Sequence, residues 1–322
     1  MKQTKNPVWS GSKATARAAA VALVAVMTIG GAFAAKLNVV ASIPDLGDMA
    51  REIGGERVRV DVLATGREDF HAVPARPSYL PRLNRADLLL NLGLDAEHAW
   101  LPALAAEARN AKIREGGPGW VETYPGIRVL DVPARLDRSE GEQHPRGNPH
   151  YNVGPDNGKP MARNIAEAFA KADPDGAGYY AARRDAYLAR LEKLEDELRA
   201  RGAPLRGLHI VSHHPDVSYL AAFYGMVVEG SIEPKPGVTP SAGSLQTLTN
   251  AARGRGVRLV LHNQAQNPRL PEKVAAEIGA TRVEFLNMAS AEGEARTWIG
   301  LQRENLRRLL AAFEAANKSG KP

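Results

Sequence analysis

Short apolar runs alternate along the chain with segments whose apolar residues recur every three or four positions. Runs such as residues 37–43 and 58–63 are rich in β-branched residues or alternate apolar with polar positions, as β-strands do. Because strands that alternate with helices form parallel sheets, the pattern predicts an α/β fold. The predicted strands are residues 37–43, 58–63, 88–92, 128–132, 209–212, 226–232, 257–261 and 281–286. The predicted helices are residues 44–55, 77–86, 99–108, 159–170, 218–224, 241–255, 271–278 and a closing helix that contains Trp298.

One helical segment is much longer than the others. Asp173 and Pro174 provide an N-cap followed by proline at the first helical position. Helical spacing then continues to about residue 200, before Gly202 and Pro204 end it. The apolar residues at this spacing are Tyr180, Tyr187, Leu191, Leu194 and Leu198. Such a helix would be about 40 Å long, roughly the size of a domain, and could join two domains stiffly.

The first residues form a pattern of their own. Basic residues without any acidic residue are followed by the apolar residues 18–29 and by a small-x-small pattern at residues 32–34. These features are typical of a secretory signal peptide, whereas a membrane anchor needs about 20 apolar residues. We therefore expect residues 1–34 to be a signal peptide that is cleaved near Ala34, and the mature chain to be periplasmic.

Charge and cysteine content limit what the mature chain can do. The whole chain has 42 basic and 36 acidic residues, a net charge of +6. Without the predicted signal peptide, 38 basic and 36 acidic residues remain, which is not the basic surface typical of nucleic-acid binding. The absence of cysteine excludes disulfides, Cys-ligated zinc or iron–sulfur sites and a lipid-modified cysteine. We expect a soluble chain without a nucleic-acid partner.

Three histidines lie in widely separated parts of the chain, at the ends of predicted strands or in short loops. They are His71, His150 and His214. Neutral imidazole is a common zinc ligand, and zinc sites typically hold four ligands in a tetrahedron. Imidazoles that are distant in sequence and meet on folding are typical of such a site. Spacing alone carries little weight, so the neighbouring residues matter.

The segments around these histidines resemble those of a known family. EDFH at residues 68–71 is similar to its first-ligand motif, GNPHYNVGPDNGK at residues 147–159 to its second, and SHHPDVSY at residues 212–219 to its third. VVASIPDLGDMAREIGGERVRVDVLATG at residues 39–66 and EPKPGVTPSAGSL at residues 233–245 also match. The chain thus resembles the zinc-receptor-like members of the periplasmic solute-binding proteins that deliver zinc or manganese to ABC importers.

This resemblance implies an architecture. Two α/β lobes, each with a parallel sheet flanked by helices, are joined by one long rigid helix. The corresponding segments are an N-terminal lobe at residues 35–172, a linking helix at residues 173–202 and a C-terminal lobe at residues 203–322.

The resemblance also implies a metal site between the lobes. Its ligands are His71 and His150 of the first lobe and His214 of the second. In the third motif the ligand lies five residues before a tyrosine, and counting back from Tyr219 selects His214 rather than His213.

Two positions depart from the family pattern. Phe70 replaces the proline before the first ligand, and Asn287 aligns with the aspartate that usually supplies the fourth ligand. An amide is a poorer zinc ligand than a carboxylate. The fourth position is therefore uncertain and could hold water or another group, with Glu233 as a candidate. These departures also leave open a degenerate member of the family.

Other polar residues have less specific expectations. Ligating imidazoles usually donate their second N–H to an oxygen, and the candidates are Asp45, Asp69 and Asp156. Asp156 could equally be a helix N-cap. The remaining histidines are expected to be structural at His98 and His209, exposed at His144, turned away from the metal at His213 and hydrogen-bonded at a strand end at His262.

The leading hypothesis is a receptor that binds Zn²⁺ as its transported ligand and passes it to an ABC-type metal permease in the inner membrane. Imidazole at the third position favours zinc, because manganese suits carboxylate-richer sites. A receptor for manganese or another divalent metal is one alternative. A three-His zinc hydrolase with an activated water is an alternative of another class, although the motifs contain no obvious general base. We expect a monomer without enzyme activity, and a metallochaperone is a further candidate partner.

Overall fold

The computed structural model describes residues 1–4, 36–135, 144–233, 237–290 and 293–318. The chain divides into two compact units, Met1–Ala34 and Ala35–Pro322. The predicted signal peptide corresponds to the first unit, and most of it lies outside the described residues. Within the described part of the chain, every helix is too short or too polar to cross a membrane.

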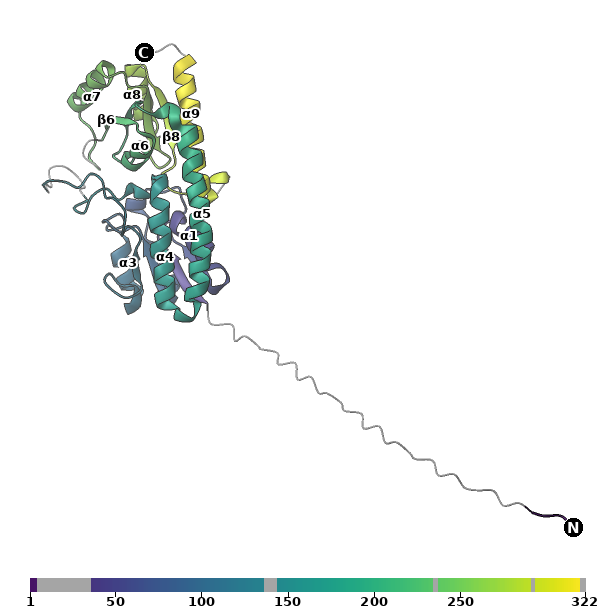
Figure 1. The fold of residues 1–322 in the computed structure, drawn as a ribbon. Coiled ribbons are helices and arrows are strands. Elements are labelled where there is room, and N and C mark those ends of the chain that lie inside the picture. The colour runs from purple at the N-terminus through teal and green to yellow at the C-terminus, as the bar shows by residue number, and fades with distance from the viewer. Residues whose placement is uncertain (5–35, 136–143, 234–236, 291–292, 319–322) are drawn as a thin grey trace. The chain divides into compact units, whose positions relative to one another are not determined.

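Residues of the second unit form two four-stranded sheets, and every strand pair in them is parallel (Figure 1). The strand orders are β2-β1-β3-β4 in what we call the first lobe and β6-β5-β7-β8 in the second lobe. The strands are β1 Leu37–Ala41, β2 Val58–Val62, β3 Leu88–Asn91, β4 Trp120–Glu122, β5 His209–Ser212, β6 Val227–Ser231, β7 Leu259–Asn263 and β8 Thr281–Phe285. Strands β3 and β7 are buried throughout, as expected for parallel strands covered on both faces. The predicted α/β fold with two parallel sheets is thus confirmed.

Helices connect these strands and end where the sequence provides a signal. For example, α1 begins at Pro44, whose fixed φ suits a first helical turn, and ends before Gly55, which has a positive φ of 49°. The helices of the first lobe are α1 Pro44–Gly54, α2 Leu80–Arg85, α3 Leu101–Glu107 and α4 Gly158–Ala172. Those of the second lobe are α6 Ser218–Tyr224, α7 Ala242–Gly254, α8 Arg269–Ile278 and α9 Trp298–Lys318.

The long helix α5, Ala177–Gly202, packs against both lobes. It contacts α1 and α4 of the first lobe and α6 and α9 of the second, and Figure 1 shows it running past both sheets. Its buried apolar residues are those expected from helical spacing: Tyr180, Tyr187, Leu191, Leu194 and Leu198. One helix therefore sets the spacing of the two lobes.

The start of this helix differs from the prediction. Residues Pro174–Gly176 form a separate 3-10 turn before α5. The Asp173 carboxylate does not cap a backbone N–H there and instead accepts hydrogen bonds from Arg57 at 2.8 Å and from the Tyr180 hydroxyl at 2.7 Å. A nearby arginine competes successfully for the carboxylate, because a charge-assisted hydrogen bond is stronger than a neutral one.

The fourth strand of the first sheet is not where the pattern placed it. Residues 128–132 lie outside the sheet, and the strand is β4. The backbone of Leu130 is paired elsewhere: its carbonyl accepts from the Asn148 N–H at 2.9 Å, and its N–H donates to the Tyr219 hydroxyl at 3.0 Å. The prediction was wrong because an extended apolar segment can satisfy its backbone groups outside a sheet. A three-residue strand is also too short to show alternation.

A buried polar contact joins the lobes near the start of α1. Asp45 accepts hydrogen bonds from the Ala289 N–H of the second lobe at 2.8 Å and from the Asn152 amide at 3.1 Å. The same Asn152 amide donates to the Asn287 carbonyl at 2.7 Å. Gly66 has a φ of +87°, and a Cβ there would lie 2.3 Å from the Ala289 carbonyl oxygen. Glycine therefore allows the two backbones to approach this closely.

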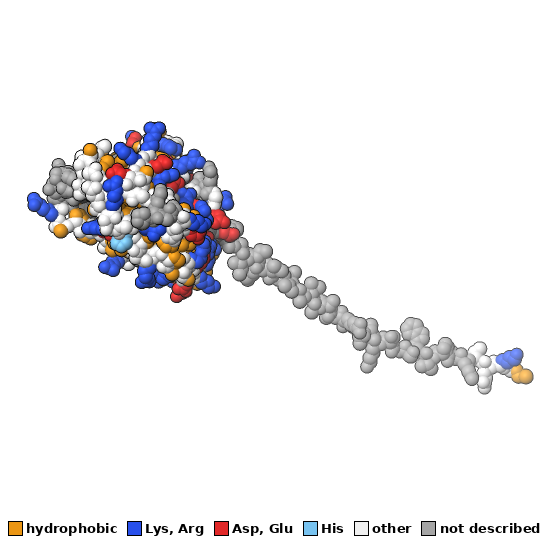
Figure 2. Space-filling view, turned by 90° about the horizontal axis from the view of Figure 1, so that it is seen from above, with side chains coloured by type: hydrophobic (Ala, Val, Ile, Leu, Met, Phe, Trp, Pro, Cys, Tyr) orange, Lys and Arg blue, Asp and Glu red, His pale blue; other side chains and the backbone are white. Residues whose placement is uncertain are grey.

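The surface carries charges of both signs. Figure 2 shows lysine and arginine side chains spread over one face, with acidic side chains between them. Ion pairs between such residues include Arg190–Glu52 at 2.8 Å and Arg303–Glu197 at 2.7 Å. Exposed pairs of this kind contribute up to about 1 kcal/mol each, so they adjust stability rather than determine the fold.

The half-buried carboxyl of Asp48 should make stability depend on pH. It accepts from the Trp298 N–H at the start of α9 at 2.8 Å, and burial raises its pKa from 3.8 to about 6. The folded chain therefore holds this proton to higher pH than the unfolded chain, and stability falls as pH rises from about 4 to about 6. Asp48→Asn keeps an acceptor for Trp298 and removes the ionisation. Between these pH values, we expect the free energy of unfolding to decrease by less in the variant than in the wild type, with a difference on the order of 1–3 kcal/mol.

Urea unfolding of the metal-free protein at about pH 4 and about pH 6.5 measures this difference. Asp175→Asn, which changes an exposed carboxylate in the turn before α5, is the control and should leave the pH dependence unchanged. Identical pH dependence in the wild type and Asp48→Asn would show that burial of Asp48 is not responsible.

Candidate metal-binding site

Three imidazoles from two lobes meet where the lobes adjoin. His71 lies in the turn Phe70–Ala72 after β2, His150 begins the turn His150–Val153, and His214 follows β5. One ring nitrogen from each lies within 4.8 Å of those of the other two. The Nε2 atoms of His71 and His150 are 3.1 Å apart, and these two residues are 6% and 2% exposed. The structure thus brings together the three histidines singled out in the sequence.

The first histidine is oriented by the surrounding backbone. Its Nδ1 lies 2.9 Å from the Ala96 carbonyl oxygen, and because a carbonyl only accepts, Nδ1 carries the proton and Nε2 keeps its lone pair. Asp69 accepts from the backbone N–H of His71 at 3.0 Å and so starts the turn. The Phe70 ring lies against His71 and His150, with centroid distances of 4.5 and 4.7 Å. Phe70, which stands where the family usually has proline, therefore packs beside both imidazoles.

A buried glutamate supports the turn that presents the Ala96 carbonyl. Glu97 is 4% exposed and accepts from the Ser42 hydroxyl at 2.6 Å and the Leu92 N–H at 2.9 Å. Burial raises its pKa to about 7. No motif in the sequence pointed to Glu97. The one feature of the sequence that could have indicated Glu97 is its place as an acidic residue within the largely apolar segment of residues 88–105.

The pKa values of the other two imidazoles shift in opposite directions. The His150 Nδ1 is buried and lacks a hydrogen-bond partner among the described residues. Burial holds the pKa of His150 well below its ordinary value. Burial also lowers the pKa of His214, but the Glu233 carboxylate and the charge of Asp216 more than offset this, so that it is raised overall. The neutral imidazole is the form that binds metal. His150 therefore stays in its metal-binding form, whereas protons compete with the metal at His214.

Glu233 lies behind the third histidine. Its carboxylate is 3.8 Å from the His214 Nδ1 and 3.4 Å from the His213 Nε2. Hydrogen bonds with His213 and His214 lower its pKa to about 2, so it is ionised at neutral pH. A carboxylate on the outer nitrogen of a ligating imidazole fixes the ring and raises its basicity. The position of Glu233 fits this orienting role.

The three aspartates expected to support the imidazole rings have other contacts, and that prediction was wrong. Asp69 bonds the His71 backbone, Asp45 bonds Ala289 and Asn152, and Asp156 is exposed in the turn Pro155–Asn157. The groups that do face the outer ring nitrogens come from other segments.

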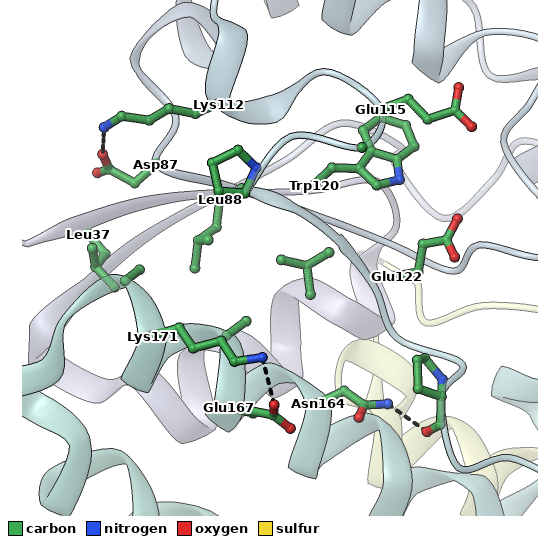
Figure 3. A pocket seen from close by; sticks show the side chains of 17 residues that line it. Leu37, Asp87, Leu88, Lys112, Glu115, Trp120, Glu122, Asn164, Glu167 and Lys171 are labelled. Carbon is green, nitrogen blue, oxygen red and sulfur yellow. Dashed lines mark hydrogen bonds and ion pairs between the residues drawn. The ribbon is translucent and has the colours of Figure 1, made fainter.

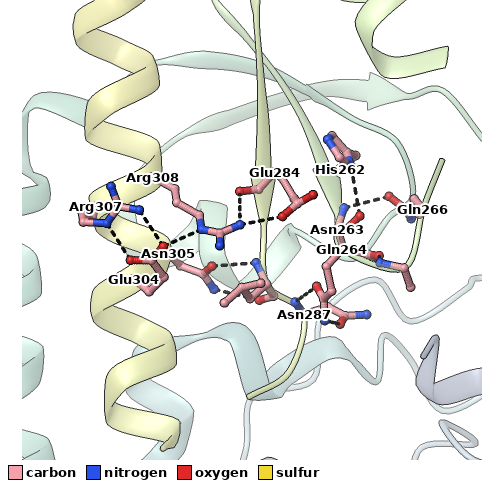
Figure 4. A network of polar contacts seen from close by, with 12 residues as sticks. His262, Asn263, Gln264, Gln266, Glu284, Asn287, Glu304, Asn305, Arg307 and Arg308 are labelled. Atoms are coloured by element: carbon pink, nitrogen blue, oxygen red, sulfur yellow. Dashed lines mark hydrogen bonds and ion pairs between the residues drawn. The ribbon is translucent and has the colours of Figure 1, made fainter. Parts of the chain in front are cut away.

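Asn287, which aligns with the family's aspartate, belongs to a polar network of the second lobe (Figure 4). Its Oδ1 accepts from the Gln264 amide at 2.7 Å, and its backbone N–H donates to the same side chain at 3.0 Å. Asn305 bonds both the N–H and the carbonyl of Leu286, at 2.8 and 2.9 Å. The amide oxygen of Asn287 is therefore already engaged by Gln264.

His144 lies against His71, although it was expected to be exposed. Its half-buried ring stacks on His71, with centroids 4.8 Å apart and ring planes inclined by 22°. Burial lowers its pKa to about 3. The expectation was wrong because the surrounding loop has no periodic pattern from which packing can be read. The packing of His144 depends on a contact between distant segments.

The other four histidines have partners outside the three-histidine group. His262, for example, is fully buried between a carbonyl oxygen and a guanidinium group. These contacts agree with the structural roles expected of them. The partners are Glu233 for His213, Asp95 for His98, Glu229 for His209, and Asn263 and Arg282 for His262.

A cavity that is separate from the three histidines lies along β4 and α4 of the first lobe (Figure 3). It measures about 1000 Å³ and has Trp120 on one wall. The ion pairs Lys112–Asp87 at 3.0 Å and Lys171–Glu167 at 2.7 Å lie at its edge. Histidine is absent from its lining, so the three-histidine group remains the candidate metal site.

Comparisons with known proteins find similarity to proteins named for zinc and manganese transport. The chain is 26% identical over 304 residues to the high-affinity zinc uptake system protein ZnuA of Paracoccus denitrificans. This alignment covers 84% of the chain and 88% of that protein. The manganese ABC transporter substrate-binding lipoprotein scaA of Streptococcus gordonii is 24% identical over 169 residues, 52% of this chain and 51% of that protein. The crystal structure of a ZnuA deletion mutant with zinc bound superimposes on this chain with a TM-score of 0.68 and 30% sequence identity. The superposition covers 88% of this chain and 97% of the mutant chain.

The family model described as zinc-uptake complex component A, periplasmic, matches residues 39–312, which is most of the chain. The chain therefore belongs to this family of periplasmic zinc-uptake components.

Proposed function

We propose that the chain captures Zn²⁺ between its two lobes with His71, His150 and His214 and delivers it to an ABC-type permease in the inner membrane. The observation that carries this proposal is the approach of one ring nitrogen from each histidine to within 4.8 Å of the others. Three neutral imidazoles are a suitable donor set for zinc. Membership of a periplasmic zinc-uptake family supports the transport role.

The donor chemistry favours zinc over manganese. Imidazole suits zinc, whereas carboxylate, carbonyl and water oxygens suit manganese. The Glu233 carboxylate lies 3.8 Å from the Nδ1 of His214, and the Asn287 amide oxygen accepts from Gln264. A manganese receptor is the second candidate, because a relative named for manganese matches 52% of the chain.

A three-histidine set leaves one position of the zinc tetrahedron open, and we infer that water fills it. Three protein ligands and a water are also the pattern of catalytic zinc sites. A hydrolase would need a general base, and the nearby Glu233, with a pKa of about 2, is a weak base. The binding role therefore accounts for the site better than catalysis does.

The rest of the proposal concerns export and partners. Residues 1–34 act as a signal peptide that is removed near Ala34 and leaves the mature chain in the periplasm. Residues 35–172 and 203–322 form the lobes, and residues 173–202 join them. The mature chain acts as a monomer that meets the permease, and a metallochaperone is a candidate source of the metal.

Removal of one imidazole should abolish tight zinc binding. The wild type should bind one Zn²⁺ per mature chain, and His150→Ala should weaken binding by more than about 100-fold, since loss of an outer partner alone typically costs 10–100-fold. Competition with a chelator of known affinity measures the dissociation constant. His98→Ala, at an exposed histidine outside the group, is the matched control and should bind as the wild type does. Equal losses in the two variants would contradict the assignment.

Proton competition should follow His214, whose pKa is raised, rather than His150, whose pKa is lowered. Below the pKa of His214, each pH unit should weaken zinc binding by up to about tenfold. Glu233→Gln removes a charge that raises this pKa, so the weakening should begin at lower pH. In that variant, binding at neutral pH should also fall by about tenfold.

Dissociation constants between about pH 5 and about pH 7, corrected for protonation of the chelator, test both expectations. An affinity that stays constant over this range in the wild type would rule out His214 as a ligand.

A further inference from the structure

Asn148 uses every polar group that it has, although it is only 6% exposed. Its backbone N–H donates to the Leu130 carbonyl at 2.9 Å, and its carbonyl accepts from the Tyr219 hydroxyl of the second lobe at 2.8 Å. Its side-chain Oδ1 accepts from the backbone N–H of His150 at 2.9 Å. One end of the side chain therefore holds the segment that carries the second histidine.

The other end of the side chain reaches the second lobe. The Nδ2 atom donates to the carbonyl of Pro215, the residue next to His214, at 2.8 Å. It also donates at 2.9 Å to the Asp131 carboxylate, which in turn accepts from the Ser218 hydroxyl at 2.5 Å. A single amide thus bonds backbone beside two of the three histidines, one in each lobe.

We propose that Asn148 is a positioning residue that sets the separation of His150 and His214 across the lobes. This inference rests on the proposed function. Asn148 acts through the backbone on either side of the site and does not touch the metal. Zinc–ligand distances tolerate deviations of only about 0.2 Å, so displacement of either backbone segment weakens the site.

The bonding pattern requires an amide. An aspartate at this position could still accept from the His150 N–H, but it has no donor for the Pro215 carbonyl. It would also place a second carboxylate beside that of the exposed Asp131, and the two like charges would repel each other. The change from amide to carboxylate therefore breaks the contact between lobes while keeping the local turn and the size of the side chain.

The chain contains a matched control for this change. Asn110 has the same pattern, since its Oδ1 accepts from the Lys112 N–H at 3.2 Å and its Nδ2 donates to the carbonyls of Leu83 at 2.9 Å and Ala86 at 2.7 Å. All these partners lie within the first lobe, in segments that carry none of the three histidines. Asn110→Asp therefore removes equivalent hydrogen bonds away from the site.

The experiment measures zinc affinity by chelator competition and the visible spectrum of the Co²⁺-loaded protein, which reports ligand geometry. Asn148→Asp should weaken zinc binding by about 10–100-fold and shift the cobalt bands. Asn110→Asp should leave both unchanged. In the double variant Asn148→Asp with Asp131→Asn, an amide donor faces the new carboxylate and the repulsion is removed. Its zinc affinity should therefore be at least about threefold higher than that of Asn148→Asp alone, which is the coupling expected of residues in contact.

Circular dichroism decides whether each variant is folded. If Asn148→Asp does not fold, Asn148→Ser takes its place under the same expectation, because serine keeps a short acceptor for the His150 N–H without the Nδ2 donor. Wild-type affinity and spectrum in the folded Asn148 variant, or an equal loss in Asn110→Asp, would overturn this inference alone. A wild-type chain that binds neither zinc nor cobalt would overturn the proposed function and this inference with it.

Discussion

The packing of three imidazoles within a few ångströms of one another, two of them buried and the third half-buried, is the condition on which the rest of the site depends. Burial holds the pKa of His150 low and so keeps its ring neutral, which is the form that binds metal. It also removes the water that would otherwise pair with the ring nitrogens. The protein must then supply these partners itself, with the Ala96 carbonyl for His71 and the Glu233 carboxylate for His214. Each partner fixes a ring as well as solvating it.

Because the rings come from two lobes, their positions are only as fixed as the contact between the lobes. That contact contains directional hydrogen bonds, such as Asp45 to the Ala289 N–H and the Gln264 amide to the Gly66 carbonyl at 3.2 Å. A buried polar group left without its partner costs about 1–3 kcal/mol, so sliding the lobes would be unfavourable at several points at once. An apolar contact of equal area would resist separation but would permit small shifts, since burial of apolar area has no direction.

The fold was largely predictable because each buried strand and each glycine-terminated helix leaves a local pattern, and the three histidines lie at the ends of such elements. Where the prediction failed, contacts between distant segments decide the outcome. Residues 128–132 have a strand-like pattern but pair with Asn148 and Tyr219. The stacking of His144 on His71 leaves no mark in the loop sequence. Support for the rings was expected from three aspartates that have other contacts in the folded chain. The carboxylate beside His214 is that of Glu233, 19 residues further along the chain.

The linking helix has a consequence for how the protein discriminates among ions. Helix α5 has 26 residues, or about 39 Å of continuous backbone, and it packs on both lobes. Lobes held in this way have little freedom to close further on a small ion or to open for a large one. An ion is then selected by how well its radius and coordination number fit a fixed spacing of ring nitrogens. Such a site disfavours Ca²⁺, because this ion takes six to eight oxygen ligands.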